Sequence, residues 1–303
     1  MLSFSNQTLT HSVWILLKKM SALKTSLIVL WSSICLSTAV AADREVGLTL
    51  GVYTSDKPTT MYAKFKPILH YLESQIPNHI DTPVQLKLRI FKNYTEARQA
   101  LVQNHVDFVR FGPASYIVAQ KENPHIRLLA VEERHGKLKF QGAIFTTEES
   151  PIKSLKDLQG KRFAFGNRHS TIGRYLAQQE LLNAGISSTD LHSFAYLDRH
   201  DKVVQLVALG KFSAGSAKKS SLRKVKGLRI IRSFDNPSKP WIARSTMSDS
   251  LFLALQTSLI KLTDKKTLQS LCKKCTGFRL VNHQFFDSTK QAIEVSTRFT
   301  RAQ

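Results

Sequence analysis

The stretch KRFAFGNRHSTIGRYLAQQELLNAGI, residues 161–186, joins a predicted strand directly to a predicted helix. Its apolar start is typical of a buried strand, and the apolar residues that follow recur at the three- and four-residue steps of a helix ending at Gly185. Ser170 or Thr171 is expected at the N-cap, where a hydroxyl usually satisfies its own helix. Gly173 stands where a capping-box glutamate would be, so the first-turn N–H groups could instead hold an anion.

Strands and helices alternate along most of the chain. The 303 residues are 42% hydrophobic and 22% charged, which is enough for one large core or two smaller ones. Predicted strands at 46–52 and 84–91 each precede a predicted helix, and short loops join them. This order indicates an α/β protein with a mostly parallel sheet covered by helices. No repeat or long linker separates the cores, so we expect strands to join them.

In such folds ligands bind at the turns that follow the carboxyl ends of strands. Four turns carry glycine or polar side chains there: YTSDKPTT, FGPASY, GNRHST and DRHDK. Each turn alone is weak evidence for a binding site. The glycine and proline of FGPASY are explained by turn formation, and a single histidine such as His200 is more often a loop residue whose hydrogen bonds are met within the protein. Together they predict a pocket that offers hydroxyl, N–H and imidazole groups to a small oxyanion.

Residues 1–41 have the order of a secretory signal peptide. Three lysines precede the apolar run SLIVLW, and the small-residue motif AVA follows, with cleavage expected after Ala41. Met20 is an alternative start that gives a more typical signal length. The apolar run is shorter than the ~20 residues of a membrane span, and Ile34 before Cys35 does not fit a lipoprotein site. We therefore expect a protein exported to the periplasm without an anchor of its own.

The chain is strongly basic, with a formal net charge of +22. Nucleic-acid binding is not expected, because the chain carries an export signal and no nucleic-acid-binding motif. The charge is concentrated between Lys202 and Phe234, where nine Lys or Arg residues occur without an acid. Such a run either attracts anions or an acidic partner surface, or it is simply a basic surface.

Two cysteines, Cys272 and Cys275, remain after export. In an oxidising compartment their default state is a small structural disulfide, although a pair three residues apart could be redox-active. Zinc is a weak alternative, because only His283 lies nearby in the sequence.

Four stretches resemble a known family: DFVRFGPASY, DLQGKRFAFGNRHSTIGRYLAQQELLNAGI, HDKVVQLVALGKFSAG and SFDNPSKPW. They are similar to the periplasmic substrate-binding proteins of phosphate, phosphite and phosphonate ABC transporters, the PhnD-like family, from about Leu48 to Phe278. The resemblance implies an α/β, two-lobed periplasmic-binding-protein (type II) fold, in which each lobe is a mostly parallel sheet flanked by helices and the ligand cleft lies between the lobes.

The resemblance also implies domain boundaries. Residues 42–142 would form the first part of lobe 1, residues 143–233 would form lobe 2, and residues 234–303 would return to lobe 1. Two crossing strands near Gln141–Phe145 and Ile231–Phe234 would form the hinge, about which the lobes close over the anion.

The same resemblance implies a function and a site. The protein would capture a small phosphorus oxyanion and deliver it to an ABC permease, as a monomer, without a cofactor, a metal or enzymatic activity. The alternative is a periplasmic sensing subunit for a membrane sensor kinase, a partner that Arg110 before FGPASY also suggests. The implied ligand residues are Tyr53, Ser115, Tyr116, Ser170, Thr171 and His200.

Two further features of the sequence bear on the ligand and on catalysis. Where the family commonly has Asp-Ala-Gly-Ala, this chain has Ser213–Ser216, followed by Lys218. Loss of that acid puts 2-aminoethylphosphonate in doubt and favours phosphate, phosphite or a small alkylphosphonate. Catalysis by Ser170, His200 and Asp201 is not expected, because the chain has no G-x-S-x-G elbow and its adjacent His and Asp are badly placed for a triad.

Overall fold

The structure is a computed structural model that describes residues 45–54 and 58–299. The predicted signal peptide, residues 1–41, lies outside the described residues. Within the described ranges, no helix combines the length and the apolar character that a bilayer crossing requires.

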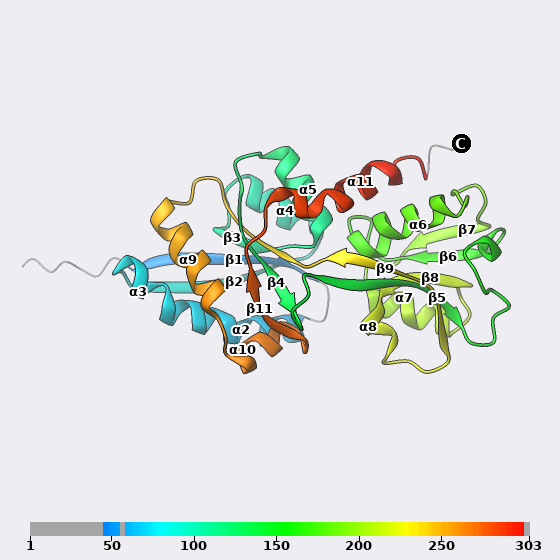
Figure 1. Ribbon diagram of the computed structural model, residues 1–303, viewed down its shortest axis with the longest axis horizontal. Coiled ribbons are helices and arrows are strands. Elements are labelled where there is room, and N and C mark those ends of the chain that lie inside the picture. The colour runs from blue at the N-terminus through cyan, green and yellow to red at the C-terminus, as the bar shows by residue number, and fades with distance from the viewer. Residues whose placement is uncertain (1–44, 55–57, 300–303) are drawn as a thin grey trace, which may run out of the picture. The chain divides into compact units, whose positions relative to one another are not determined.

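A six-stranded sheet takes strands from both ends of the described chain (Figure 1). In spatial order its strands are β11 (Cys275–Arg279), β4 (Arg127–Arg134), β10 (Pro240–Ala243), β3 (Phe108–Arg110), β1 (Val46–Tyr53) and β2 (Val84–Phe91). We call this sheet and the helices that pack on it the first lobe.

A five-stranded sheet is built entirely from the middle of the chain. In spatial order its strands are β7 (Ser193–Tyr196), β6 (Arg162–Phe165), β8 (Ala214–Lys218), β5 (Lys139–Thr147) and β9 (Leu228–Pro237). We call this sheet and its helices the second lobe. The FAF of the opening stretch forms β6 and is buried on both faces, as a central strand must be.

Both sheets are mixed. β1 runs parallel to β2 and β3, and β6 runs parallel to β7 and β8, as expected of strands that alternate with helices. The remaining pairs are antiparallel, because β5, β9, β10 and β11 cross between the lobes or return to the first one. Parallel pairing therefore joins β1 to β2 and β3, and β6 to β7 and β8, whereas the other pairs run antiparallel.

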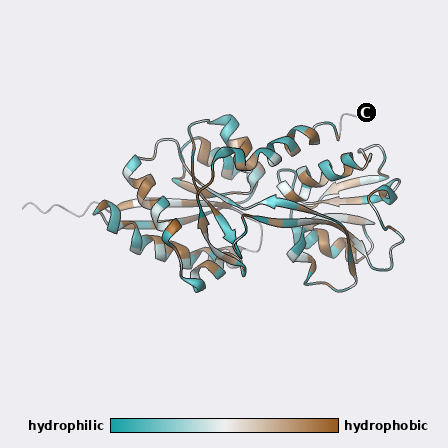
Figure 2. Cartoon of the chain, viewed as in Figure 1, coloured by the Kyte–Doolittle hydropathy of each residue, from teal (hydrophilic) through white to brown (hydrophobic). Residues whose placement is uncertain are grey.

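The helices cover the two sheets on both sides. In the first lobe they are α2 (Pro58–Gln75), α3 (Pro77–Ile80), α4 (Tyr94–Val102), α5 (Pro113–Glu122), α9 (Asp249–Lys261) and α10 (Lys265–Leu271). In the second lobe they are η1 (Lys156–Leu158), η2 (Thr171–Leu176), α6 (Ala177–Asn183), α7 (His200–Ala208) and α8 (Lys219–Leu222). Figure 2 shows apolar and polar residues along each long helix, as expected of helices with one buried side.

The chain crosses between the lobes at two points, where β4 is followed by β5 and where β9 is followed by β10 (Figure 1). β5 pairs with β9 along its whole length, from Lys139 opposite Pro237 to Thr147 opposite Leu228. The predicted crossings near Gln141–Phe145 and Ile231–Phe234 therefore lie inside the second sheet. The chain changes sheets just before β5 begins and just after β9 ends.

The C-terminal helices lie between the lobes. η3 (His283–Phe286) begins this segment, and α11 (Asp287–Ser296) packs against α5 of the first lobe and against η2 and α6 of the second. Phe286 is buried in the core of the first lobe, whereas Phe299 is buried in that of the second. The return segment thus contacts both lobes.

Candidate functional site

The N-terminus of α5 meets the second lobe. Its N-cap, Gly112, donates its amide hydrogen to the hydroxyl of Tyr53 over 2.7 Å. The amide of Ala114 donates to Oγ1 of Thr171, on the second lobe, over 3.0 Å. A Cβ at position 112 would lie 2.9 Å from the Tyr53 hydroxyl and 3.5 Å from Thr171 Oγ1, so only glycine allows this approach. Hydroxyls from both lobes therefore converge on one helix N-terminus.

The Tyr53 hydroxyl remains a hydrogen-bond donor at neutral pH. Burial raises the pKa of Tyr53, and this effect exceeds the opposing effects of the Arg110 charge and the Gly112 hydrogen bond. A hydroxyl that accepts an N–H keeps its own O–H for another acceptor. Tyr94 stacks on Tyr53 with 3.8 Å between ring centroids. Burial raises the pKa of Tyr94 well above its usual value, and Ser170 of the second lobe lies close enough to oppose part of this shift. Tyr94 thus belongs to the same site.

Ser170 is the N-cap of η2. Its Oγ accepts a hydrogen bond from the amide of Gly173 over 2.9 Å, so it caps its own helix in the usual way. Thr171, the other candidate for the cap, is the first residue of the helix and is free to reach the first lobe. A Cβ on Gly173 would lie 2.8 Å from Cα of Gly166, so close backbone packing holds this turn in place.

The two candidate residues of GPASY point in different directions, as neighbours on a helix do. The Tyr116 hydroxyl contacts Nδ1 of His283, and its ring packs on Phe286 in the core of the first lobe. Ser115 is 5% exposed and lies close enough to Tyr53 to lower its pKa. Its Oγ has no hydrogen-bond partner among the residues that the structure describes. The geometry therefore places Ser115 with Tyr53, and it places Tyr116 in the core.

His200 begins α7, and its Nδ1 is buried without a hydrogen-bond partner among the described residues. Burial and the charges of Lys218 and Lys239 lower the pKa of His200 to about 4, while Asp201 acts in the opposite direction. The imidazole is therefore neutral at pH 7. The Asp201 carboxylate instead binds Arg199 over two contacts of 3.1 Å, so the His and Asp of this turn do not form a catalytic pair.

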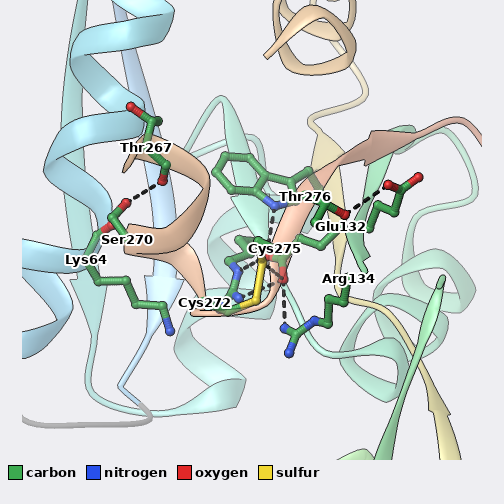
Figure 3. The surroundings of a disulfide bond; sticks show 11 residues. Lys64, Glu132, Arg134, Thr267, Ser270, Cys272, Cys275 and Thr276 are labelled. Carbon is green, nitrogen blue, oxygen red and sulfur yellow. Dashed lines mark hydrogen bonds and ion pairs between the residues drawn. A yellow bond between two sulfur atoms is a disulfide. The ribbon is translucent and has the colours of Figure 1, made fainter. Parts of the chain in front are cut away.

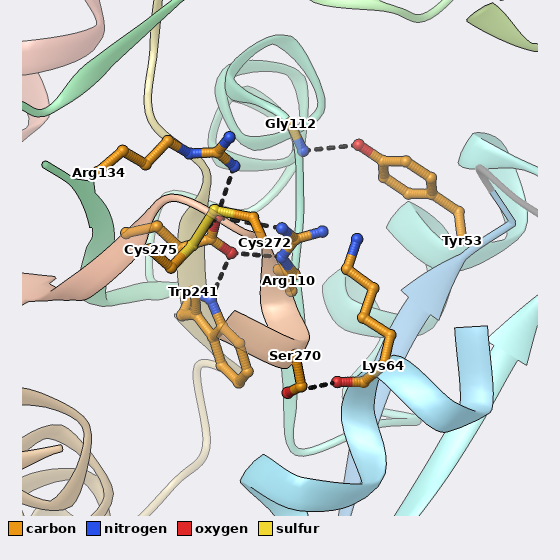
Figure 4. A network of polar contacts seen from close by, with 10 residues as sticks. Tyr53, Lys64, Arg110, Gly112, Arg134, Trp241, Ser270, Cys272 and Cys275 are labelled. Atoms are coloured by element: carbon orange, nitrogen blue, oxygen red, sulfur yellow. Dashed lines mark hydrogen bonds and ion pairs between the residues drawn. A yellow bond between two sulfur atoms is a disulfide. The ribbon is translucent and has the colours of Figure 1, made fainter. Parts of the chain in front are cut away.

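A buried ion-pair network lies beside Tyr53 (Figure 4). Nη2 of Arg110 donates to Oε2 of Glu132 over 3.1 Å, Nε of Arg110 donates to Oε1, and Nη2 of Arg134 donates to Oε2 over 2.9 Å. Burial opposes ionisation of Glu132, but the two guanidinium charges outweigh it and hold the pKa of Glu132 below its usual range. The carboxylate is therefore charged and shared by two cations.

Two lysines bring further positive charge to the site. Lys218 ends β8, and its Nζ lies 5.4 Å from the ring centroid of Phe140. Lys239 lies where the chain crosses from β9 to β10, and its Nζ lies 5.9 Å from the ring centroid of Tyr53. Burial and neighbouring cations lower the pKa of both, that of Lys218 to about 7. Desolvated ammonium groups at this position favour a bound anion.

The two cysteines at the end of α10 form a disulfide (Figure 3). Cys275 Sγ lies 4.0 Å from Oε2 of Glu132, so the bridge packs against the carboxylate that holds the two arginines. Thr276, the next residue, donates to Glu133 over 2.9 Å and fixes β11 beside β4. The Cys272–Cys275 pair thus forms one wall of the network.

A cavity of about 470 Å³ opens between the lobes, where the start of α4 faces the loop that precedes η2. It is lined by Asn93, Thr95, Glu96, Asn167, Arg168, His169, Tyr196 and Asp198. Oγ1 of Thr95 and Nε2 of His169 approach to 3.4 Å and form a second polar contact between the lobes. Within the described ranges, no group of three or more His, Cys, Asp or Glu residues could hold a metal ion.

Tyr94, Arg134 and Lys239 belong to the site but were not predicted as site residues. Tyr94 follows the carboxyl end of β2, so the strand-end criterion would have found it if applied to the turn FKNYTEAR. Arg134 and Lys239 lie at the two crossings; Lys239 falls in the stretch SFDNPSKPW, but nothing in that stretch predicts a role for it.

Comparison with known proteins identifies the family. The sequence profile described as "ABC transporter, phosphonate, periplasmic substrate-binding protein" matches residues 50–285. The chain is 29% identical over 142 residues to the probable ABC transporter phosphite-binding protein PhnD1 of Prochlorococcus marinus, covering 45% of this chain and 48% of that protein. It is 24% identical over 180 residues to the phosphate-import protein PhnD of Mycolicibacterium smegmatis, covering 56% and 54%. The chain therefore spans about half the length of these curated relatives.

The fold agrees with this assignment. The solved structure of PhnD1 from Prochlorococcus marinus in complex with methylphosphonate superimposes with a TM-score of 0.73 at 19% identity, covering 83% of this chain and 98% of that one. The family consists of periplasmic substrate-binding proteins of ABC importers, which are not enzymes. Because the profile matches most of the chain and the fold resembles that of a solved PhnD1 structure, this protein belongs to the family of periplasmic substrate-binding proteins of phosphonate ABC transporters.

Proposed function

We propose that the protein captures a small phosphorus oxyanion (phosphonate, phosphite or phosphate) between its lobes and delivers it to an ABC permease. The lobes in this proposal are bounded by the start of β5 at Lys139 and the end of β9 at Pro237, close to the boundaries expected at 142/143 and 233/234. The family match and the relatives named for phosphite binding and phosphate import support this function and favour the importer over the sensor-kinase alternative.

The observation that carries the proposal is the hydrogen bond from Ala114 of the first lobe to Thr171 of the second. It joins the N-termini of two helices, which favour negative charge. The hydroxyls of Tyr53, Ser115 and Thr171 each retain an O–H to donate. A tetrahedral oxyanion, with several acceptor oxygens, matches such a set of donors.

Neutral donors are suited to this ligand class. A hydrogen bond to a charged group contributes roughly 1.5–3 kcal/mol, so three or four such bonds give ample affinity after the cost of association. Neutral His200 adds an imidazole whose hydrogen-bonding role depends on its tautomer. We propose Tyr53, Ser115, Ser170, Thr171 and His200 as ligand residues and add Tyr94; the burial of the Tyr116 hydroxyl against His283 does not support Tyr116.

The test is a calorimetric and thermal-shift screen of residues 42–303 with phosphate, phosphite, methylphosphonate, sulfate and acetate. We expect at least one phosphorus oxyanion to bind in the micromolar range or more tightly, and to stabilise the fold by about 2.7 kcal/mol at 100 times its dissociation constant. Preferential binding of sulfate or acetate, or no binding of any phosphorus compound, would refute the ligand class. Stimulation of the cognate importer's ATPase by the loaded protein would support the partner.

A further inference from the structure

When its basic groups are all protonated, the cluster beside the oxyanion site carries more positive charge than a single phosphorus oxyanion neutralises. Arg110, Arg134, Lys218 and Lys239 lie together with Glu132, the single carboxylate that binds any of them among the described residues. With the lysines protonated, four cations against one acid leave a formal charge of 4 − 1 = +3. A phosphonate, phosphite or phosphate carries at most about two negative charges near neutral pH.

The two lysines hold the uncompensated part of this charge. Both arginines bind Glu132, whereas no ion pair joins Lys218 or Lys239 to a carboxylate in the part of the chain that the structure describes. Each lysine instead lies near an aromatic ring, Lys218 near Phe140 and Lys239 near Tyr53. Lysine so close to other cations is destabilising unless an anion joins it.

The positions of the lysines relative to the hydroxyl site are also fixed. Lys239 reaches Tyr53, a proposed ligand residue, from the crossing between β9 and β10. Lys218 stands opposite Gly142 of β5 on the second lobe, and the charges of both lysines act on His200. Figure 4 shows the Lys64 amino group directed toward Arg110, which adds a further cation on the same side. The lysines thus adjoin the oxyanion donors and come from different parts of the fold.

We propose that Lys218 and Lys239 form a second anion subsite, and that the ligand is a phosphorus oxyanion carrying a second acidic group a few bonds away. This inference rests on the proposed function. The hydroxyls and helix N-termini hold the phosphorus group, and the lysines hold the second acidic group, a carboxylate or a second phosphoryl group. The same lysines repel an amino group.

Lowered lysine pKa values support this arrangement. Burial, followed by the charges of Arg134, Lys64 and Arg110, lowers the pKa of Lys218, and only Glu132 acts in the opposite direction. A bound anion reverses this effect and restores the ammonium form. Binding of the second acidic group is therefore expected to take up protons above pH 7.

The experiment uses three phosphonates of similar size that differ in the charge of their second group: phosphonoacetate (negative), ethylphosphonate (neutral) and 2-aminoethylphosphonate (positive). Titration calorimetry at pH 7 is expected to show that phosphonoacetate binds most tightly, ethylphosphonate less tightly and 2-aminoethylphosphonate least tightly. The affinities of the first two should differ at least tenfold. Methylenediphosphonate in the same series distinguishes a second phosphoryl group from a carboxylate.

Matched variants locate the effect. Lys218→Gln is expected to remove most of the affinity difference between phosphonoacetate and ethylphosphonate. Lys224→Gln removes the same charge at an exposed position of the second lobe and is expected to preserve that difference. Because Lys218→Gln relieves repulsion among cations, its melting temperature without ligand should not fall. Ethylphosphonate binding as tightly as phosphonoacetate would overturn the second subsite and leave the oxyanion site standing. Failure of all four compounds, together with phosphate and phosphite, would overturn both.

Discussion

Replacing Thr171 with valine separates ligand binding from folding. Valine has nearly the same shape as threonine but cannot accept the hydrogen bond that the Ala114 amide donates across the lobes over 3.0 Å. Thr171 and Ala114 are 5% and 1% exposed, so water cannot replace the lost acceptor when the lobes are together. When the lobes are apart, water hydrates both groups. The substitution therefore penalises the closed form and not the folded lobes.

The size of the penalty follows from these contacts. A buried donor without an acceptor costs about 1–3 kcal/mol, which corresponds to roughly a 5- to 150-fold loss of affinity. Loss of the Thr171 O–H as a donor to the oxyanion adds to this loss, so the lower figure is a minimum. The melting temperature without ligand is expected to change by less than about 2 °C, since the bond joins two lobes that each have a core of their own.

The assay is titration calorimetry with the best-binding phosphorus oxyanion, accompanied by thermal unfolding without ligand. Thr146→Val is the matched control, because Thr146 is fully buried and its hydroxyl donates to the Ser213 carbonyl within the second lobe over 2.7 Å. We expect the control to lower the melting temperature by roughly 2–4 °C and to preserve affinity. Unchanged affinity in Thr171→Val, or an equal loss in both variants, would refute the placement of Thr171 at the ligand.

Three further predictions concern other parts of the site. Gly112→Ala should weaken oxyanion binding at least tenfold, because the new methyl displaces the Tyr53 hydroxyl, whereas Gly47→Ala, which has no atom within 4 Å of its new methyl, should bind normally in the same titration. Cys272→Ser should lower the unfolding free energy by roughly 2 kcal/mol, the loop-entropy value for so short a ring, and should make the melting curve insensitive to reductant; an unchanged melting temperature would exclude a structural disulfide. The lowered pKa of His200 means that the unfolded chain binds more protons than the ligand-free fold between about pH 6.5 and 4, so stability should fall as pH falls through this window. Denaturant unfolding at pH 7, 6 and 5 should show a smaller decline for His200→Gln, and an equal decline would contradict the burial of a neutral imidazole.

Local patterns predicted the regular elements well. The run at 84–91 forms β2 with the predicted bounds, and the helix predicted to follow it begins at Tyr94. After Ser154 the chain forms only the three-residue turn η1 and no α-helix. Asp157 accepts hydrogen bonds from the amides of Lys153 and Ser154, and this local competition closes a turn in place of a helix.

Part of the candidate site was predictable because some of its residues lie in local sequence patterns. Hydroxyls such as Thr171 stand at strand ends, a position that sequence order reveals. The basic groups are different, because Lys218 is brought to Lys239 by the pairing of β8 with β5 and by the crossing between the sheets. Pairing of strands distant in sequence is a tertiary property, which composition and periodicity do not encode. The +22 charge left open whether the basic residues serve an anion, an acidic partner or neither, and only the fold shows which cations lie together.

Helix α11 limits how the lobes can move. Two strand crossings leave essentially one rotational degree of freedom, a swing about the line that joins them. α11 contacts both lobes, and Figure 1 shows it apart from those crossings. Phe286 and Phe299, both fully buried, fasten the segment at its two ends in different cores. A large swing must pull one ring from its core, so α11 and its two aromatic anchors limit how far the lobes can separate, a restraint that the strand crossings do not supply.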